Sequence, residues 1–353
     1  MYDKILFFMS TKLKSLDRLT TFRIHAKAKN IITVTSSNTL AKEWRQAVDR
    51  KEPVVILGEG SNVLFLEDFN GTIILNRIKG ISVTEDSSTW KLHVGAGEKW
   101  HELVQYSLAN GMSGLENLAL IFGCVGSAPI QNIGAYGIEF ARVCEYVDVL
   151  NLHKNEQFRL TADQCQFGYR ESIFTHDYRH GYAVVSVGIC LDKHWQPVLE
   201  YGDLKKLSLH NVTPKQVFDS VCHMRTTNLP NPWHHGNAGS FFKNPIVKTV
   251  LASQIKEKYP EVPMYLQVSG DVKLAAAWLI ERCELKGFQI GGAAVDKTHA
   301  LVLINIDHAT SSDVVKLARN VRTCVARKFG IWLEPEVRFI SSVSEVNFIE
   351  VLE

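Results

Sequence analysis

Short apolar runs separated by glycine-rich and polar segments mark the first two thirds of the chain. Residues 53–57, 72–75 and 91–94 are apolar and β-rich, and residues 182–191 form a longer run of the same kind, so each predicts a strand. Over residues 98–110 the large apolar side chains recur on one helical face, which predicts a helix. Strands and helices do not alternate regularly here, so the pattern predicts an α+β arrangement rather than repeated βαβ units.

The pattern changes in the last third of the chain, where helical periodicity alternates with short strand signals. Residues 272–284 predict a helix, and residues 300–304 and 336–340 predict strands. A second helix is predicted after the N-cap cluster at residues 311–313, and Gly330 stands where this helix would stop. This part of the chain is therefore predicted to be a compact α/β unit.

The composition is that of a soluble globular protein and limits the choice of partners. Apolar residues make up 46% of the chain and charged residues 22%, as in an ordinary globular protein. A length of 353 residues is enough for two or three domains with sizeable cores. The formal net charge is only +2 and no long basic run occurs, so nucleic acid is not expected as a partner. The seven scattered cysteines include no C-x-x-C pair, which favours reduced thiols in the cytoplasm.

Neither a membrane segment nor a metal site is expected. The apolar run at residues 5–9 is too short for a signal peptide or a membrane span. Residues 1–10 are therefore interpreted as a disordered or adventitious extension, with Met9 as an alternative start. The adjacent His234 and His235 point apart and have no evident third ligand, so a solvated loop is the better interpretation.

Two glycine-rich loops could hold a phosphate-containing ligand through backbone N–H groups. The first, residues 58–62, is not a Rossmann fingerprint, because Val63 takes the third glycine position and residues 63–66 continue as a strand. Alone, such a loop is more often a plain turn. A second loop at residues 123–137 makes a ligand-binding role the better interpretation, because two loops of this kind would suit a long dinucleotide lying across two lobes. The candidate cofactor-binding residues are Gly58, Glu59, Gly60, Ser61, Asn62, Gly123, Gly126, Ser127, Asn132, Gly134, Ala135, Tyr136 and Gly137.

The most informative stretch is residues 236–245, Gly-Asn-Ala-Gly-Ser-Phe-Phe-Lys-Asn-Pro. Its small residues let a ligand approach the backbone, and Ser240, Lys243 and Asn244 supply a hydroxyl, an ammonium and a carboxamide. A surface turn would gain nothing from two phenylalanines, and a buried strand would avoid Asn-Pro at its end. The stretch is therefore interpreted as an ordered, partly desolvated wall of a site.

Three further positions are ambiguous from the residues alone. Arg170 follows a Phe-Gly-Tyr stretch, and the simpler interpretation is a surface arginine on a strand. Tyr201 begins a Tyr-Gly-Asp-Leu stretch that is typical of an ordinary turn. Glu336 opens an apolar strand, where a carboxylate is usually solvated. If Glu336 were half buried and faced Ser240, it would be an acid–base or electrostatic partner.

In combination, these motifs resemble those of the UDP-N-acetylenolpyruvoylglucosamine reductases, in order from about residue 13 to residue 340. The resemblance implies an α+β fold with a two-lobed FAD-binding domain of the vanillyl-alcohol-oxidase/cresol-methylhydroxylase kind and a smaller α/β substrate domain. Tyr201 indicates the longer of the family's two structural types, in which a mobile loop carries this tyrosine. The implied domains are residues 1–78, 79–229 and 230–353, with the strand at 331–340 returning to the FAD region. The matching motifs lie at residues 57–62, 123–137, 167–172, 236–245, 291–294 and 333–338.

The resemblance also implies a reaction and roles for single residues. The family reduces UDP-N-acetylglucosamine enolpyruvate to UDP-N-acetylmuramate, a peptidoglycan precursor, with noncovalent FAD as cofactor and NADPH as co-substrate. Ser240 matches the serine that protonates the substrate, and Arg170 with Glu336 matches the pair that polarises the enolpyruvyl carboxylate. A monomer in the cytoplasm is expected. The implied substrate-binding residues are Tyr201, Asn244, Lys243 and Arg225.

Three residues depart from the family pattern, and two other functions remain open. Asn228 replaces a lysine that is expected to hold a nucleotide phosphate, and in the FAD lobes Phe122 replaces a proline and Arg23 a glycine. One alternative is a flavin oxidase or dehydrogenase of the same fold that acts on another alcohol or sugar and does not need Ser240. The other is a catalytically decayed flavin-binding module.

Overall fold

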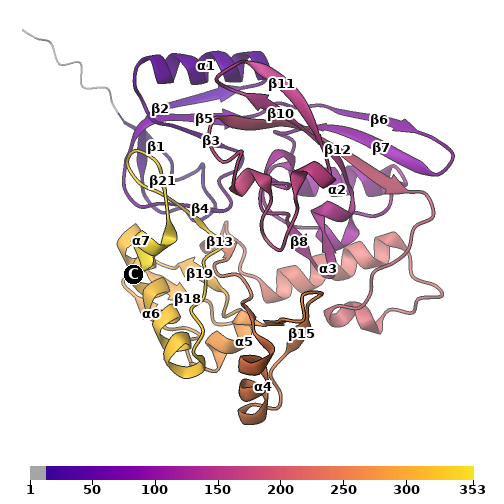
Figure 1. Cartoon of the computed structure of the whole chain (residues 1–353), viewed down its shortest axis with the longest axis vertical. Coiled ribbons are helices and arrows are strands. Elements are labelled where there is room, and N and C mark those ends of the chain that lie inside the picture. The colour runs from indigo at the N-terminus through magenta and orange to yellow at the C-terminus, as the bar shows by residue number, and fades with distance from the viewer. Residues whose placement is uncertain (1–12) are drawn as a thin grey trace, which may run out of the picture.

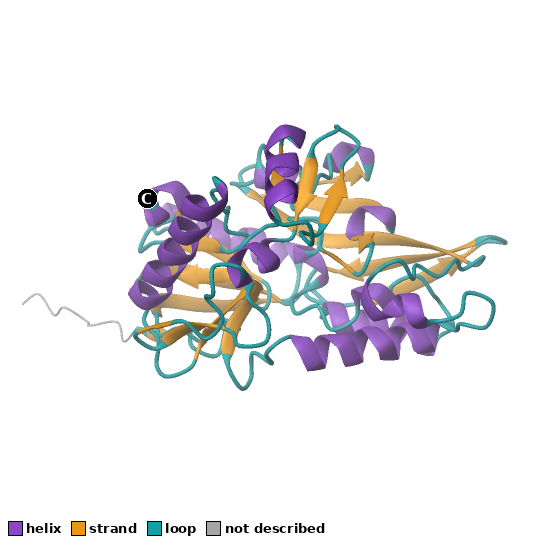
Figure 2. Ribbon diagram, turned by 90° about the horizontal axis from the view of Figure 1, so that it is seen from below, coloured by secondary structure: helices purple, strands orange, loops and turns teal. Residues whose placement is uncertain are grey.

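Three main sheets follow one another along residues 13–353, the part of the chain that the computed structural model describes (Figure 1). The first and third have four strands and the second has five. Figure 2 shows helices on the outside of these strands on several sides of the molecule. The mixture of sheets and helices confirms the predicted α+β class.

The first sheet combines parallel strands with one helical crossover. Its order is β1 (Lys14–Ser15), β2 (Lys27–Val34), β5 (Phe69–Asn76) and β3 (Val54–Leu57). Strands β2 and β3 run parallel to β5, whereas β1 pairs antiparallel with β2. Helix α1 (Ser37–Asp49) begins after Ser36, whose hydroxyl accepts the N–H of Thr39 in a capping box. The strands predicted at residues 53–57 and 72–75 are confirmed as β3 and part of β5.

The second sheet is antiparallel throughout. Its order is β11 (Glu156–Thr161), β10 (Cys144–Asn151), β12 (Tyr182–Asp192), β7 (Thr89–Gly95) and β6 (Ile81–Glu85). Its helices are α2 (Trp100–Ala109) and α3 (Pro214–Asn228). Trp100 of α2 shares one buried core with Val187 of the central strand β12. The strands predicted at residues 91–94 and 182–191 and the helix predicted at residues 98–110 are confirmed.

The third sheet and its helices form the α/β unit predicted for the last third of the chain. The sheet has the order β13 (Gly236–Ser240), β19 (Val302–Asn305), β18 (Ala293–Val295) and β17 (Gln289–Ile290). A smaller sheet has the order β14 (Ile246–Val247), β16 (Val272–Leu274) and β15 (Met264–Leu266). The helices are α4 (Thr249–Lys258), α5 (Ala276–Glu281) and α6 (Ser311–Phe329). Helix α6 starts after Thr310 and ends at Gly330, whose φ of +70° confirms the predicted stop.

The helix predicted over residues 272–284 is wrong in its first part. Residues 272–274 form strand β16, and the helix is only α5. Val272 and Leu274 are buried whereas Lys273 between them is partly exposed, which is the alternation of a strand. Over three residues this alternation resembles the start of a helical period, so the two could not be told apart by pattern.

After helix α6 the chain leaves the third sheet and returns to the N-terminal part of the protein. Strand β20 (Arg338–Ile340) pairs in parallel with β4 (Val63–Phe65) and antiparallel with β21 (Glu345–Val346). It begins two residues later than predicted, so Glu336 lies just before it. The remaining elements are α7 (Phe348–Leu352), β8 (Gly134–Ala135), β9 (Ile138–Glu139), and the 3₁₀ helices η1 (Glu116–Leu118), η2 (Val125–Ser127), η3 (Phe140–Arg142), η4 (Asp163–Cys165), η5 (Ile173–Thr175) and η6 (Gly202–Lys206).

Three expectations concern the N-terminus, membranes and metals. The proposed extension at residues 1–10, with its alternative start at Met9, lies outside the described residues. Within residues 13–353, no helix is long and apolar enough to cross a membrane. The same residues contain no group of three or more His, Cys, Asp or Glu side chains that could hold a metal, and His234 and His235 are exposed.

Candidate active site

The two glycine-rich loops and strand β13 line one cavity. Its volume is about 240 Å³, and its wall includes Gly58, Ser127 and Ser240. A second cavity of about 240 Å³ adjoins it and shares Gly58 and Ser127 with it. Together they offer a long space, as a ligand that spans two lobes requires. The first cavity is lined by the candidate residues Gly58, Glu59, Gly60, Ser61, Asn62, Ser127, Gly134, Arg170, Arg225, Ser240 and Glu336, and the second also by Gly126.

Close packing requires glycine at two points, where the first loop meets Leu19 and where the second loop meets the first. Gly60 has a φ of +59°, and a Cβ atom there would lie 2.2 Å from the carbonyl oxygen of Leu19. Gly123 has a φ of +126°, and a Cβ atom there would lie 2.9 Å from Oγ of Ser61. The Ser61 hydroxyl in turn donates to the carbonyl of Phe122 at 3.1 Å. The first loop is therefore fixed against the second at this edge of the cavity.

Some residues in the second half of the second loop are directed away from the cavities. Asn132 is buried with a φ of +44°, and its Nδ2 donates to Oε2 of Glu139 at 2.9 Å and to the carbonyl of Gly168 at 3.0 Å. Its carboxamide is thus used inside the protein. Tyr136 packs edge-to-face on Tyr201, with ring centroids 5.8 Å apart. The candidates that line neither cavity are Gly123, Asn132, Ala135, Tyr136 and Gly137.

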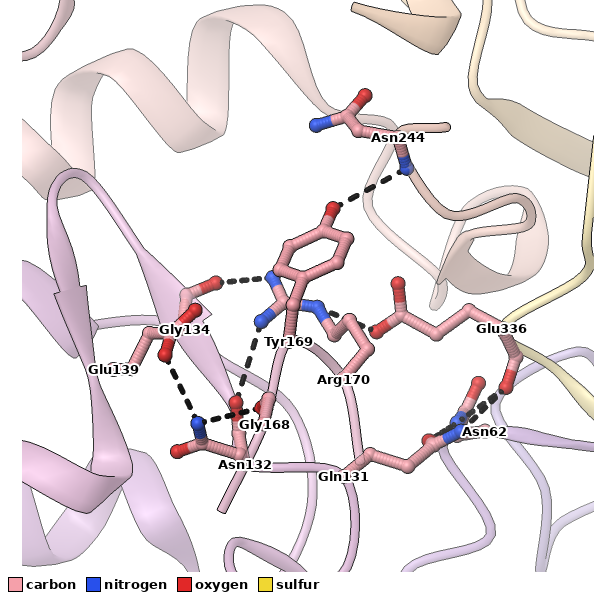
Figure 3. A network of polar contacts seen from close by, with 10 residues as sticks. All are labelled: Asn62, Gln131, Asn132, Gly134, Glu139, Gly168, Tyr169, Arg170, Asn244 and Glu336. Atoms are coloured by element: carbon pink, nitrogen blue, oxygen red, sulfur yellow. Dashed lines mark hydrogen bonds and ion pairs between the residues drawn. The ribbon is translucent and has the colours of Figure 1, made fainter. Parts of the chain in front are cut away.

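Arg170 is held at the cavity by an unusual backbone and by two carbonyl groups. Its φ is +57°, a conformation that residues other than glycine rarely adopt. Its Nη2 donates to the carbonyl of Gly134 at 2.7 Å, and its Nη1 donates to that of Asn132 at 3.3 Å (Figure 3). Its Nε lies 3.1 Å from Oε1 of Glu336, and its side chain is only 17% exposed. The alternative of a surface arginine on a strand therefore does not hold.

Glu336 is a largely buried carboxylate beside two cations. Burial raises the pKa of its carboxyl group, and the charges of Arg170 and Lys243 oppose this rise. Its main-chain N–H donates to the carbonyl of Phe241 at 2.8 Å, and Phe241 directly follows Ser240. Glu336 and Ser240 therefore lie on neighbouring backbone segments and line the same cavity. Glu336 is thus largely buried and its backbone lies beside that of Ser240, while its carboxylate faces Arg170.

Gln131 belongs to the site, although the sequence reasoning missed it. Its side chain lines the first cavity, and its Nε2 donates to the main-chain carbonyl of Glu336 at 3.0 Å. Nδ2 of Asn62 donates to the same carbonyl at 3.1 Å and also to Oε1 of Gln131 (Figure 3). The signal that could have found it is its place in the second glycine-rich loop, directly before Asn132.

Ser240 ends strand β13 at the wall of the cavity. The next residues, Phe241 and Phe242, are each 1% exposed and anchor the strand end in the core. The pairing of β13 with β19 shifts register between Asn237 and Ser240, so the strand is irregular just before the serine. Within residues 13–353 the Ser240 hydroxyl has no hydrogen-bond partner, so it is available to a ligand in the cavity.

Asn244 and Lys243 line a space other than the cavity of Ser240, and Lys243 also lines a cavity of about 270 Å³ with Arg170 and Glu336. The Oδ1 atom of Asn244 accepts the N–H of Ala276 at 2.9 Å, and its main-chain N–H donates to the hydroxyl of Tyr169 at 3.2 Å. Nζ of Lys243 lies 3.8 Å from Oε2 of Glu334. Both residues line a cavity of about 520 Å³ together with Tyr169, and neither lines the cavity of Ser240. Tyr169 is a further residue of this region that the sequence reasoning did not select.

Arg225 lines the cavity of Ser240, whereas Tyr201 lies outside it. Burial lowers the pKa of the Arg225 guanidinium, and within residues 13–353 its buried Nε has no hydrogen-bond partner. Tyr201 is 46% exposed and lies at the start of η6 against the ring of Tyr136. Arg225 therefore brings a guanidinium with an unpaired Nε to the wall of this cavity, and Tyr201 does not reach that space in this conformation.

The three departures from the family pattern occupy different places. Phe122 lines the first cavity and is 42% exposed. Asn228 is the last residue of α3, and it is exposed. Arg23 has a φ of +55°, and its Nη1 donates to the carbonyl of Trp233 at 2.9 Å. The left-handed backbone at Arg23 explains why glycine suits this position.

Comparisons with known proteins agree with this architecture along nearly the whole chain. A family model described as FAD binding domain matches residues 28–160, and one described as UDP-N-acetylenolpyruvoylglucosamine reductase, C-terminal domain, matches residues 231–340. Curated reductases of that name from Pectobacterium atrosepticum and Escherichia coli (strain K12) are 60% and 57% identical over 344 and 338 residues. These alignments cover 98% and 96% of this chain and 100% and 99% of the relatives.

A solved structure supports the fold. The structure of UDP-N-acetylenolpyruvylglucosamine reductase from Thermus caldophilus is 24% identical, with a TM-score of 0.62 over 93% of this chain and 98% of that one. The agreement of the overall fold adds to the far higher identity of the curated relatives. The chain belongs to the UDP-N-acetylenolpyruvoylglucosamine reductase family.

Proposed function

We propose that this protein reduces UDP-N-acetylglucosamine enolpyruvate to UDP-N-acetylmuramate, with FAD as cofactor and NADPH as reductant, in peptidoglycan precursor synthesis. The observation that carries the proposal is the meeting of Ser240, Arg170 and Glu336 in one cavity that both glycine-rich loops also line. The curated relatives carry the name of this activity and match nearly the whole chain. A flavin oxidase for another substrate would have no need of these three groups together.

The residues around the two adjoining cavities fit a noncovalently held FAD. Gly58 and Ser127 line both cavities, so one extended ligand could contact both glycine-rich loops. Cys124 lines the second cavity, but burial raises the pKa of its thiol to about 11, which makes it a poor nucleophile for a covalent flavin bond. Bound FAD would supply the hydride of the reduction. The chain supplies binding, orientation and charge.

Arg170 and Glu336 are placed to act on the substrate's carboxylate. Addition of a hydride to the vinyl group leaves negative charge on the neighbouring carbon and its carboxylate. The fixed guanidinium of Arg170 would stabilise that charge, and one preorganised donor is worth about 3–4 kcal/mol in comparable sites. Its two bonds to the carbonyls of Asn132 and Gly134 hold it in place before substrate arrives. Glu336 fixes the third side of the guanidinium and keeps the local charge balanced.

Ser240 is placed to deliver the proton that completes the reduction. A serine hydroxyl is a weak acid in water, but a carbanionic carbon is a far stronger base than an alkoxide. The hydroxyl lies at the cavity wall, at the end of the strand next to Glu336. It would therefore face a substrate bound in the cavity. The rigid Phe241 and Phe242 behind it keep that approach fixed.

Four other residues are proposed to bind the nucleotide part of the substrate. Arg225 is the most directly placed, because its uncompensated charge lines the cavity. Lys243 and Asn244 line a neighbouring cavity, so they would contact an arm of the substrate that extends there. Tyr201 would contact the substrate only if its loop closed over the cavity, as in the longer structural type of the family.

We further propose domains at residues 1–78, 79–229 and 230–353. This division keeps the first sheet, the second sheet and the third sheet each within one domain. The return of the strand within residues 331–340 to the FAD region is supported by the parallel pairing of β20 with β4. A monomer that works in the cytoplasm is the simplest form consistent with this organisation.

One experiment tests the activity and its alternatives. The purified protein should carry yellow flavin that is released on denaturation, and NADPH oxidation should require the UDP-enolpyruvyl sugar. Flavin without substrate-dependent NADPH oxidation would reject the proposal in favour of a decayed module. Oxidation of an unrelated alcohol or sugar, with no response to the UDP-sugar, would reject it in favour of a flavin oxidase.

A further inference from the structure

The main-chain carbonyl of Glu336 is held by two carboxamides from two different loops. Nε2 of Gln131 donates to it at 3.0 Å and Nδ2 of Asn62 at 3.1 Å. Nδ2 of Asn62 also donates to Oε1 of Gln131, so the two side chains hold each other as well (Figure 3). Asn62 lies in the first glycine-rich loop and Gln131 in the second, so three distant segments meet at one carbonyl oxygen.

This carbonyl lies where the backbone changes partners. Before it, Glu334 and Glu336 pair with the segment of Ser240, since the N–H of Glu336 donates to the carbonyl of Phe241 at 2.8 Å. After it, the N–H of Arg338 donates to the carbonyl of Asn62 at 3.1 Å, and strand β20 pairs with β4. The carbonyl of Glu336 thus lies outside both ladders, and side chains take the place of a strand partner.

The orientation of this peptide decides where the carboxylate of Glu336 lies. A shift of the backbone of Glu336 would carry its carboxylate away from Nε of Arg170, which is 3.1 Å from Oε1. The N–H bond to Phe241 fixes one side of the residue, and the two carboxamides fix the other. Because a buried carbonyl needs a partner, loss of both donors would favour a different backbone conformation.

We propose that Gln131 and Asn62 are positioning residues for the known reaction, holding the carboxylate of Glu336 against Arg170 through its main-chain carbonyl. The inference rests on the proposed function, because it assigns Glu336 a role in the step at which substrate is reduced. Gln131 acts through Glu336, so its loss should slow the substrate half-reaction far more than flavin reduction by NADPH.

Gln131 is the better residue to test. Asn62 lies in the loop expected to touch the cofactor, and its carbonyl also accepts the N–H of Arg338, so its variants would change several contacts. Gln131→Met keeps the length of the side chain but removes its donor. Gln131→Glu restores a donor only when the introduced carboxyl group is protonated. Gln157→Met, at an exposed position on β11, is the matched control.

The experiment follows the two half-reactions of the flavin-loaded protein by stopped-flow absorbance. For Gln131→Met, reduction by NADPH should stay within about twofold of the wild type, and reoxidation by the UDP-sugar should fall at least about tenfold. The reoxidation rate of Gln131→Glu divided by that of Gln131→Met should rise as the pH falls from 8 to 5. This ratio removes the pH effects on the remaining steps of the reaction, which both variants share.

A second readout does not depend on turnover. Infrared spectra with labelled glutamate, and with Glu336→Gln to assign the band, should show a shifted carboxyl band of Glu336 in Gln131→Met and no shift in Gln157→Met. The proposal is overturned if Gln131→Met slows both half-reactions equally, if the rate ratio is flat with pH, or if the band does not move. Absence of substrate turnover in the wild-type protein would instead overturn the proposed function.

Discussion

The carboxylate of Glu336 lies 3.1 Å from Nε of Arg170, and the two side chains are only 20% and 17% exposed. Arg170 cannot follow a movement of the carboxylate, because its other nitrogens are bound to the carbonyls of Asn132 and Gly134. The ion pair is therefore kept only while both side chains hold these positions. A largely buried ion pair of this kind adds little to the stability of the fold. Its main effect is on the electrostatic field in the cavity.

Replacement of Glu336 by Gln should change the pH dependence of stability in a defined direction. Burial raises the pKa of Glu336 in the folded protein above the ordinary value of 4.5, so the folded state holds this proton longer than the unfolded state. The unfolding free energy of the wild type should therefore fall as the pH rises from about 4.5 through the raised pKa. Glutamine cannot ionise, so the stability of Glu336→Gln minus that of the wild type should rise over this window.

Urea unfolding of both proteins between pH 4 and pH 8 checks this difference. A flat difference would show that Arg170 and Lys243 balance the effect of burial, and a difference that falls with rising pH would show that they outweigh it. Glu336→Gln should also slow reoxidation of the flavin by substrate, because the guanidinium of Arg170 loses its charged partner.

Replacement of Ser240 by Ala should separate the two half-reactions. The hydroxyl is proposed to give the substrate its proton, and loss of a general acid typically costs about 10²–10⁴-fold. Flavin reduction by NADPH does not need that proton and should keep the wild-type rate. Stopped-flow absorbance measures both rates in one preparation. Equal slowing of both half-reactions would assign Ser240 a structural role only.

The fold could be predicted where local pattern and tertiary context agree. Residues 53–57 and 182–191 are strands because long β-rich runs can be buried on a sheet, and these predictions are confirmed. Residues 272–274 gave the wrong element, since three residues are too few to distinguish a period of 2 from a period of 3.6. The start of α5 depends on Asn244, a contact 32 residues away that local pattern cannot contain.

The residue types that form the site could be predicted better than the directions in which their side chains point. Ser240, Arg170 and Glu336 do line one cavity, as their joint motif implied. Asn132 was selected as a ligand for the cofactor, but its left-handed backbone turns the carboxamide toward Glu139. Gln131 was missed because its role lies in a main-chain contact with a segment 205 residues away. Side-chain direction in loops depends on such distant partners.

Replacement of Asn228 by Lys should tighten binding of a nucleotide phosphate. The residue ends α3 and is exposed, so a lysine there would be free to reach an anion and would be screened by water. Such a charge is worth about 0.2–1 kcal/mol, so the Michaelis constant for the UDP-sugar or for NADPH should fall by about 1.4-fold to fivefold. Asn228→Gln, which lengthens the side chain without charge, should leave both constants unchanged. Steady-state kinetics at low salt provide the comparison, and unchanged constants for Asn228→Lys would contradict it.

Replacement of Arg23 tests the strain of its left-handed backbone. Arg23→Gly and Arg23→Ala both lose the hydrogen bond to the carbonyl of Trp233, so they differ only in backbone preference. At a φ of +55° a residue with a Cβ atom costs roughly 1–2 kcal/mol, whereas the freedom of glycine in the unfolded chain costs about 0.5–1 kcal/mol. The glycine variant should therefore be more stable than the alanine variant by about 0.5–1 kcal/mol in urea unfolding.

The same two substitutions at Arg45 provide a control, in which the stability difference between the glycine and alanine variants should have the opposite sign. Arg45 is exposed in the interior of helix α1, where the backbone is right-handed and alanine is favoured over glycine by about 1 kcal/mol. Alanine should thus be the more stable variant at Arg45 and glycine at Arg23. If alanine were also the more stable variant at Arg23, the left-handed backbone there would carry no strain, and the family's preference for glycine would need another cause, such as the approach of the bound cofactor.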